Sequence, residues 1–250
     1  MNLIFAGTPE FALPALSTLI QSEHNLLAVL TQPDRPKGRG RQYQPSPVKQ
    51  LATQHHLPVL QPTTLKDTLL VHQLEDLQPD AIIVVAYGMM IPSALLTLPR
   101  YGCLNIHPST LPQWRGSTPI QHALLHGDSH TGVTIMQLDE GMDSGPILHH
   151  VPYTIKPEDN SQSLHDTLGQ LGANALLTTL TQLNEGTLTP TPQPHEQATY
   201  TRKITKADGK INWNQPAHAI VNQVRAYNPW PVAFCQHNNT SLRIWEAHAI

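Results

Sequence analysis

Two polar side chains that could act together on a carbonyl carbon lie at the end of one apolar run. Asn105 and His107 are separated by Ile106 in the segment G-C-L-N-I-H-P-S. Because alternate side chains of a strand share a face, both polar groups should project into one cleft while Ile106 packs on the other side. An amide N–H can donate to a developing oxyanion, and an imidazole can move a proton near neutral pH. The spacing therefore predicts a site for nucleophilic addition to a carbonyl.

An acidic loop that contains glycine, L-D-E-G-M-D-S-G, follows about one supersecondary unit later. Of its two aspartates, Asp139 can cap or brace the loop, whereas Asp143 lies between glycines that let the backbone approach a ligand closely. We therefore choose Asp143 as the third catalytic residue, which would hold the histidine or take the proton of the nucleophile. Ordinary turn formation is the alternative reading of an N-x-H triplet taken alone.

Apolar runs and helical patterns alternate through the first part of the chain. The apolar runs, each bounded by turn residues, are 3–6, 26–30, 59–60, 81–86 and 103–106. Helical spacing occurs at 11–20, 48–55, 65–77 and 119–125. This alternation predicts an α/β fold with a Rossmann-like, mostly parallel sheet and helices on both faces. Ligands of such sheets bind beyond the carboxyl ends of the strands, where Asn105 and His107 are expected.

The rest of the chain predicts a second, smaller unit after a linker. Strands are expected at 134–138 and 147–155, and a long helix over 161–183 that begins at a serine cap. The proline-rich segment T-L-T-P-T-P-Q-P-H-E-Q indicates a semi-rigid linker. We expect a catalytic domain over 1–186, a linker over 187–200 and the start of a second domain over 201–250, with strand, helix, strand and strand at 210–213, 216–227, 232–235 and 242–245. A closed barrel needs more strands than these, so we expect the sequence to be truncated.

Cysteine usage and hydropathy restrict the compartment. Cys103 and Cys235 form no C-x-x-C pair, which favours a reducing compartment over a disulfide framework. The N-terminus has no basic segment with a cleavage site, and no apolar stretch has the length of a membrane span, so we expect a cytoplasmic protein that does not bind membranes. Adjacent histidines such as His149 and His150 point to opposite faces of a strand, so no metal site is predicted.

Positive charge gathers at both ends of the chain, and the middle is acidic. Lys and Arg outnumber Asp and Glu by 6 to 3 over 1–66 and by 6 to 2 over 197–250, but are outnumbered by 13 to 3 over 67–196. Within the first segment, five basic residues fall in a stretch without acids: Arg35, Lys37, Arg39, Arg41 and Lys49. Such a patch can bind the phosphates of a nucleic acid, and a solvated loop is the alternative.

Several motifs extend beyond these local patterns. F-A-G-T-P-E-F, A-Y-G-M-M-I-P, N-I-H-P-S-T-L-P-Q-W-R-G and D-E-G-M-D-S-G resemble those of the 10-formyltetrahydrofolate-dependent formyltransferases. T-Q-P-D-R-P-K-G-R-G-R, S-P-V-K and A-Y-N-P-W-P look like motifs of the tRNA-acting members in particular. The resemblance covers all 250 residues.

The resemblance implies a reaction and its residues. A formyl group would pass from 10-formyltetrahydrofolate, a co-substrate, to the α-amino group of methionine on initiator methionyl-tRNA, for translation initiation. Asn105 and His107 would stabilise the tetrahedral oxyanion, and Asp143 would orient the imidazole and relay the proton. The residues that would hold folate are Tyr87, Gly88 and Met89 together with Ser109, Thr110, Leu111 and Pro112. Thr110 departs from the family signature S-L-L-P, which puts the packing near folate in question.

The resemblance also implies how the tRNA is bound. The second domain would be an OB-type β-barrel, present here only in part. The basic loop with Arg35, Lys37, Arg39, Arg41 and Lys49 would insert toward the acceptor stem, and the protein is expected to act as a monomer.

Two other kinds of function stay open. A formyltransferase for a small amine, such as a sugar nucleotide or glycinamide ribonucleotide, and a formyl-folate hydrolase would use the same three residues. A non-catalytic RNA-binding module is the alternative from a different class. The basic loop and the second domain argue against a small acceptor. The presence of all three catalytic candidates, the trio of Asn105, His107 and Asp143, argues against an inert module.

Overall fold

A seven-stranded sheet forms the centre of the molecule in the computed structural model, which describes residues 1–37, 42–238 and 240–250, with only the backbone of Lys37. The strand order is β5-β2-β1-β6-β7-β8-β9. The strands are β1 (Asn2–Gly7), β2 (Asn25–Leu30), β5 (Val59–Leu60), β6 (Ala81–Val85), β7 (Cys103–His107), β8 (His130–Gln137) and β9 (Ile147–Thr154). The neighbours in the run β5-β2-β1-β6-β7 pair in parallel, whereas β8 pairs antiparallel with both β7 and β9. The mostly parallel sheet is confirmed.

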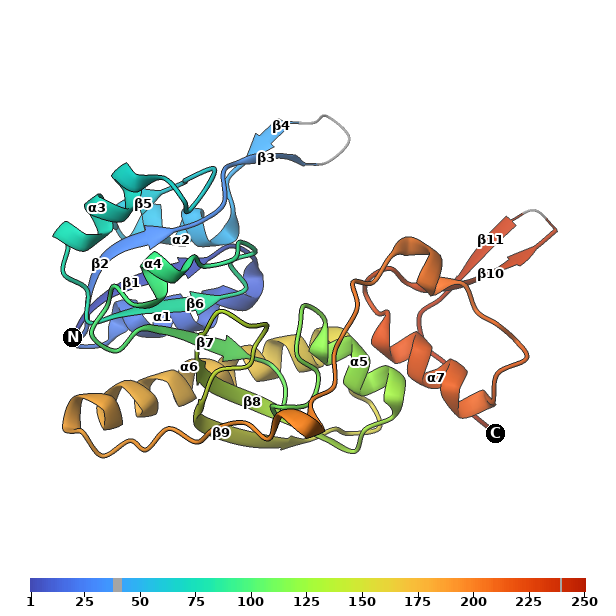
Figure 1. The fold of residues 1–250 in the computed structure, drawn as a ribbon. Coiled ribbons are helices and arrows are strands. Elements are labelled where there is room, and N and C mark those ends of the chain that lie inside the picture. Colours follow the sequence, from blue (N-terminus) through green and yellow to red (C-terminus); the bar gives the residue numbers. More distant parts are fainter. Residues whose placement is uncertain (38–41, 239) are drawn as a thin grey trace.

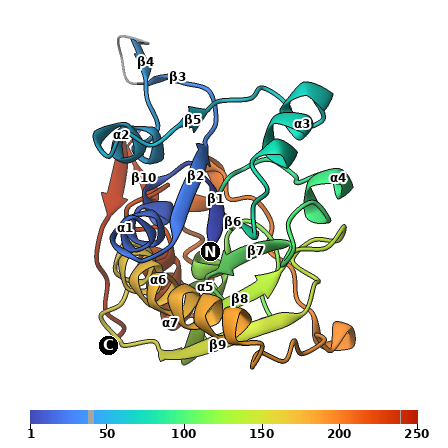
Figure 2. The ribbon, with the colours of Figure 1, turned by 90° about the vertical axis from the view of Figure 1, so that its left-hand side faces the viewer.

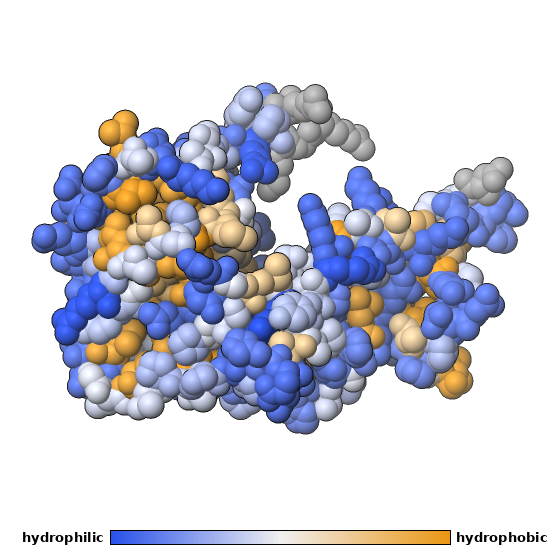
Figure 3. All heavy atoms as spheres, in the orientation of Figure 1, coloured by the Kyte–Doolittle hydropathy of each residue, from blue (hydrophilic) through white to orange (hydrophobic). Residues whose placement is uncertain are grey.

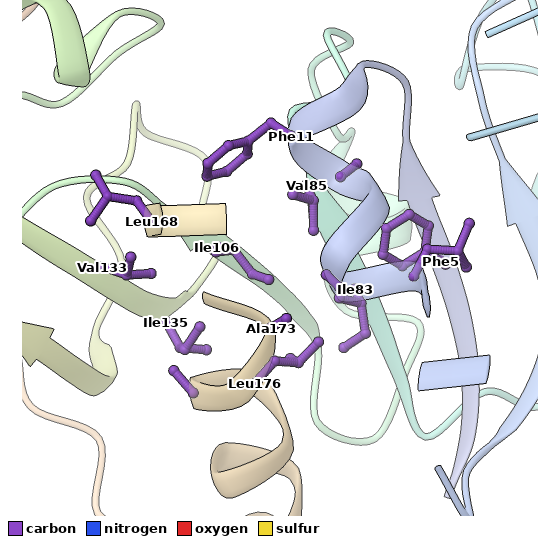
Figure 4. Packing of buried hydrophobic residues seen from close by; sticks show 14 of the residues in the cluster. Phe5, Phe11, Ile83, Val85, Ile106, Val133, Ile135, Leu168, Ala173 and Leu176 are labelled. Carbon is purple, nitrogen blue, oxygen red and sulfur yellow. The ribbon is translucent and has the colours of Figure 1, made fainter. Parts of the chain in front are cut away.

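Helices cover both faces of this sheet (Figures 1 and 2). One face packs against α1 (Leu13–Gln21), α2 (Pro47–Gln54), α5 (Pro119–His126) and α6 (Ser161–Glu185), and the other against α3 (Thr68–Asp76) and α4 (Ser93–Leu96). On β7, Leu104 and Ile106 belong to the core on the α6 side, and Figure 4 shows Ile106 among the apolar side chains of that core. Because side chains alternate along a strand, Asn105 and His107 face the α4 side, as the sequence predicts.

Helix α6 lies unusually close to the strand that carries the two polar residues. A Cβ atom on Gly172 would lie 2.5 Å from Cγ2 of Ile106 and 3.3 Å from Cγ1 of Val133. A Cβ atom on Gly169, one turn earlier, would lie 3.5 Å or more from its neighbours, an ordinary van der Waals distance. The absence of a side chain at Gly172 therefore lets the helix rest directly on β7 and β8.

We expect Gly172→Ala to lower the free energy of unfolding by about 1–3 kcal/mol, because the added methyl overpacks a filled core. Gly169→Ala, the matched control in the same helix, should raise it by about 1 kcal/mol through helix propensity alone. Urea unfolding of both variants and the wild type measures the two changes. Equal stabilities of the two alanine variants would contradict this account of the packing.

The start of α6 corrects one expectation. Asn160, not Ser161, caps the helix, and its side chain accepts from the backbone N–H groups of Gln162 at 2.9 Å and Ser163 at 3.0 Å. The hydroxyl of Ser161 instead donates to the carbonyl oxygen of Ala226, 2.5 Å away. The serine thus joins α6 to the C-terminal region.

The C-terminal region contains α7 (Ala217–Ala226) and an antiparallel hairpin of β10 (Ala233–His237) and β11 (Thr240–Ile244). The strand expected at 210–213 is wrong, since only Lys210 forms an isolated bridge, to Phe234, and the side chain of Asn212 turns the chain by accepting from the N–H of Asn214. Helix α7 packs against α5 (Figure 1). The described residues here form a helix and a hairpin rather than a closed barrel.

Smaller elements were not expected from the sequence. Strands β3 (Arg35–Lys37) and β4 (Gln42–Gln44) form an antiparallel pair that projects from the body of the molecule (Figure 1). The part of the chain that the structure describes also contains three short 3-10 helices, η1 (Glu10–Ala12), η2 (His195–Gln197) and η3 (Lys206–Gly209). Among the residues described, no helix combines the length and apolarity that a membrane span requires.

The segment predicted as a linker lies along the sheet domain. Thr191 exchanges backbone hydrogen bonds with Ile147, and the backbone of Arg115 pairs with the segment around Tyr200. Helix α6 ends at Glu185, where Gly186 adopts a left-handed conformation with φ of 69°. The division into 1–186, 187–200 and 201–250 stays a prediction, but the middle segment is held to the first part by backbone contacts.

Candidate active site

A cavity of about 620 Å³ opens at the carboxyl ends of β6 and β7. Asn105, His107 and Asp143 all line it, so the structure brings the three predicted residues together. The volume lies in the range of small-molecule sites. In the space-filling view, this side of the molecule is hollowed between the part that carries β3 and the C-terminal region (Figure 3).

The Asn105 side chain is available to a bound molecule. The residue is 9% exposed, and within the described part of the chain its amide forms no hydrogen bond to protein. Strand β7 holds it rigidly between β6 and β8, where Asn105 is opposite Val84 and Met136. A donor fixed by a strand and free of protein partners suits a developing negative charge on oxygen.

The His107 ring is held by a backbone group rather than by Asp143. Its Nε2 lies 3.0 Å from the carbonyl oxygen of Trp114, which can only accept, so Nε2 carries a proton. Its Nδ1 lies 3.7 Å from Oδ2 of Asp143, beyond hydrogen-bonding distance. The expectation that Asp143 fixes the imidazole is therefore corrected. In the neutral ring, the lone pair of Nδ1 points toward the carboxylate side of the cavity.

Burial favours the neutral form of His107. The residue is 3% exposed, and desolvation lowers the pKa of His107, against the opposing effect of the Asp143 carboxylate and the Trp114 carbonyl. A neutral ring with a free lone pair at Nδ1 can accept a proton from a group in the cavity that approaches both Nδ1 and Asp143 from one side.

This burial should also make stability depend on pH. In the unfolded chain the ring binds a proton near its ordinary pKa of 6.5, whereas the folded protein binds it only at lower pH, so the free energy of unfolding should fall as pH drops below about 6.5. In His107→Asn the free energy of unfolding should fall less steeply as the pH drops below about 6.5. Urea unfolding at several pH values measures the slope, with His72→Asn, whose side chain is 73% exposed, as the control. An unchanged slope in His107→Asn would count against a buried neutral ring.

Asp143 is fixed by the backbone around it. Its Oδ2 accepts the N–H of Gly116 at 2.7 Å, and its own φ of 49° is rare for a residue with a side chain. Asp139 instead braces the loop, because its Oδ1 accepts from the N–H of Gly141 and the hydroxyl of Ser144. Trp114, whose carbonyl contacts His107, also has a positive φ, 61°, so Asp143 and Trp114 both have a backbone conformation that is rare for a residue with a side chain.

The predicted folate residues fall into two sets. Tyr87, Gly88 and Met89 line the cavity. The side chains of the other four, Ser109, Thr110, Leu111 and Pro112, do not. They form a turn behind His107, in which Ser109 donates to the Gln113 carbonyl and Thr110 lies 3.1 Å from His150 Nε2.

The side chain of Thr134 holds this turn together, donating to the carbonyl of Ser109 and accepting from the N–H of Leu111. Thr110, which departs from the family signature, therefore contacts His150 and not the cavity. The expected role of the turn residues in holding folate stays a prediction, since none of their side chains lines this cavity: Ser109 and Leu111 are buried, and Thr110 and Pro112 are half-buried.

The basic segment is only partly described. Arg35 is exposed on β3, whereas Arg39, Arg41 and the side chain of Lys37 lie outside the described residues. Lys49 is not a free charge, since its Nζ lies 2.7 Å from Oδ2 of Asp34 and this contact lowers the pKa of Asp34. Gln61 donates to the other oxygen of Asp34. Lys49 thus anchors the segment that precedes β3, and its expected role as a phosphate contact stays a prediction.

Sequence reasoning missed the backbone groups that hold the trio. The carbonyl of Trp114 and the N–H of Gly116 contact His107 and Asp143, and both come from the W-R-G end of a motif that the sequence shows plainly. Phe11, from the motif F-A-G-T-P-E-F, also lines the cavity. The motifs were the available signal, but backbone contacts leave no signature in residue type.

The fold and the site together place a polar group suited to reaction at a carbonyl carbon at the edge of a Rossmann-like sheet. Residues 1–180 match the family model described as formyl transferase, and residues 203–250 match that of the formyl transferase C-terminal domain. The chain belongs to the formyl transferase family.

Within this family the chain is most informatively compared with named relatives. It is 53% identical over 247 residues to the methionyl-tRNA formyltransferase of Hydrogenovibrio crunogenus, and the alignment covers 99% of this chain and 79% of that protein. It is 49% identical over 250 residues to the methionyl-tRNA formyltransferase of Methylococcus capsulatus, covering 100% of this chain and 81% of that protein. The similarity is thus to methionyl-tRNA formyltransferases over nearly the whole chain.

Solved structures share the fold. A methionyl-tRNA formyltransferase from Clostridium thermocellum aligns with a TM-score of 0.66 at 17% identity, covering 100% of this chain and 94% of that one. An N-formyltransferase from Helicobacter canadensis, solved with folinic acid and dTDP-3-aminofucose, aligns with a TM-score of 0.74 at 19% identity, covering 98% and 86%. At these identities the alignments establish the fold alone.

Proposed function

We propose that the chain transfers the formyl group of 10-formyltetrahydrofolate to the α-amino group of methionine on initiator methionyl-tRNA. The observation that carries this proposal is the meeting of a free Asn105 amide with a neutral His107 and the Asp143 carboxylate in one cavity. The identity of 53% to a methionyl-tRNA formyltransferase over 99% of the chain supports the choice of acceptor.

The three side chains divide the work of the reaction. The Asn105 amide donates to the formyl oxygen as the amine attacks and negative charge develops on that oxygen. Nδ1 of His107 takes the proton that the amine loses when its bond to carbon forms, and Asp143 stabilises the imidazolium that results. The same proton then passes to the folate nitrogen as its bond to the formyl carbon breaks, so that one proton leaves the amine and one reaches folate.

The cavity suits the proposed co-substrate. Val84, Leu96 and Leu138 give it apolar walls, and Tyr87, Gly88 and Met89 form one side. Flat heterocycles with polar edges bind in sites of this kind, which are mainly apolar with a few fixed polar groups. The reaction as proposed uses no metal ion.

The charge distribution supports a tRNA acceptor. Arg35 is exposed on the projecting hairpin, and Lys and Arg exceed Asp and Glu in 197–250, so basic residues occur in both parts that border the hollow in Figure 3. Basic side chains bind phosphates and position the nucleic acid without reading its sequence. On this proposal the protein acts as a cytoplasmic monomer, and the second unit is the beginning of an OB-type domain.

A transfer assay with labelled 10-formyltetrahydrofolate tests the function. The acceptors are initiator methionyl-tRNA, elongator methionyl-tRNA, free methionine and an amino sugar nucleotide. The highest kcat/KM should be found with the initiator tRNA. A higher kcat/KM for the sugar amine would contradict the proposal, as would release of formate that does not depend on any acceptor.

A further inference from the structure

Arg115 is a buried cation without a carboxylate partner. The residue is 2% exposed, and among the described residues no acidic oxygen lies within 4.0 Å of its guanidinium. Its partners are polar groups of the segment 193–200, none of them acidic: Oε1 of Gln193, at 3.1 Å from Nε and 2.6 Å from Nη2, the hydroxyl of Tyr200 and the ring of His195. Burying a charge is costly unless its hydrogen bonds are satisfied, so this arrangement calls for an explanation beyond stability.

Gln193 connects this cation to the acidic loop. The residue is 3% exposed, and its Nε2 donates to the carbonyl oxygens of Asp143 at 2.9 Å and Gly145 at 2.7 Å. Since a guanidinium only donates, Oε1 of Gln193 must face Arg115, and the amide nitrogen must then face the loop. Arg115 thus fixes the orientation of the amide, and all four hydrogen-bonding positions of the glutamine are used.

These contacts hold Asp143 from two sides. Gln193 holds its carbonyl, and the N–H of Gly116 holds its carboxylate. Gly116 follows Arg115, whose backbone is itself paired with Thr199 and Thr201. The positive φ of Asp143, 49°, is a conformation that persists only where the surroundings impose it.

We propose that Gln193 is a positioning residue, whose amide, oriented by Arg115, holds the loop so that the Asp143 carboxylate faces His107. The proposal rests on the proposed function for the reaction concerned, but its geometric part can be measured independently. It gives the predicted linker a role in the active site, since the segment between the two parts of the chain carries the group that fixes the acidic loop.

Two substitutions separate positioning from simple support. Gln193→Glu keeps the acceptor for Arg115 and replaces the donor with an oxygen that faces two carbonyl oxygens. Gln193→Met removes both the acceptor and the donor at similar length. Gln197→Glu, an exposed position in the same segment, is the matched control. Measurements are kcat and KM with initiator methionyl-tRNA and 10-formyltetrahydrofolate, the thermal midpoint, and hydrogen exchange of the Gly116 amide.

In both Gln193 variants we expect kcat to fall by about 10- to 100-fold with KM within about twofold, because a shift of about 1 Å in a catalytic group has effects of this size. Exchange of the Gly116 amide should become faster in both. The thermal midpoint should fall in both variants, and further in Gln193→Met, where Arg115 also loses its acceptor. The loss of kcat would thus accompany loss of the donor, whereas the larger loss of stability would accompany loss of the acceptor.

A wild-type kcat in Gln193→Glu would overturn the proposal, as would a loss of kcat confined to Gln193→Met and matched by its lower midpoint. Failure of Gln193→Glu to fold would make Gln193 a residue of stability alone, with the same consequence. If the wild type does not formylate the tRNA, the proposed function fails, whereas unchanged exchange of the Gly116 amide counts against the positioning role.

Discussion

Asn105→Ala is expected to lower kcat by about a hundredfold or more, because the loss of one oxyanion donor has this effect in acyl transfer. The fold should persist, since the amide makes no hydrogen bond to other described residues and the side chain borders a cavity. KM for folate and for tRNA should change little, because the interaction strengthens only as negative charge develops on the formyl oxygen. Steady-state kinetics together with a thermal unfolding midpoint measure both effects.

Asn174→Ala, at an exposed position of α6, is the matched control and should retain full activity. A folded Asn105→Ala enzyme with near-normal turnover would refute the assignment of Asn105 as the oxyanion donor.

Asp143→Asn should lower kcat by roughly 10²-fold or more, because the proton transfer through His107 that the carboxylate supports contributes about 10²- to 10⁴-fold. The amide oxygen can still accept from the N–H of Gly116, so the loop should keep its position while the negative charge is lost. That charge raises the pKa of His107 against the effect of burial. Its removal should lower the pKa of His107 further, and the acid limb of the residual activity should move to lower pH.

Asp139→Asn provides the control for this second substitution, since Asp139 braces the same loop from a position farther from His107. It should cost less activity and leave the acid limb in place. A pH profile of kcat/KM for both variants distinguishes the cases. An acid limb in Asp143→Asn that stays fixed or moves to higher pH would contradict the proposed coupling of the carboxylate to His107.

The elements that position the site could be predicted because each has a strong local pattern. Strand β7 is short and apolar, and alternation along it correctly placed Asn105 and His107 on one face and Ile106 on the other. The antiparallel β3 and β4 were missed, because a basic segment with glycines has the composition of a loop. The expected strand at 210–213 failed because Asn212 forms a turn there.

The contacts that complete the site could not be predicted, because they join residues distant in sequence. Gln193 lies between Pro192 and Pro194, which the sequence marks as an extended linker, but nothing in that pattern indicates a contact with Asp143 fifty positions away. The hydrogen bond from His107 to the Trp114 carbonyl depends on a positive φ at Trp114. Such conformations depend on the assembled fold, which periodicity and composition do not encode.

A crystal structure of the chain with a stable analogue of 10-formyltetrahydrofolate would test the central claim most directly. The formyl oxygen should lie at about 2.7–3.1 Å from Nδ2 of Asn105, the range for an oxyanion donor, with the formyl carbon open to attack from the side of His107 Nδ1 and Asp143. A formyl group bound in the cavity but directed away from all three side chains would contradict the account.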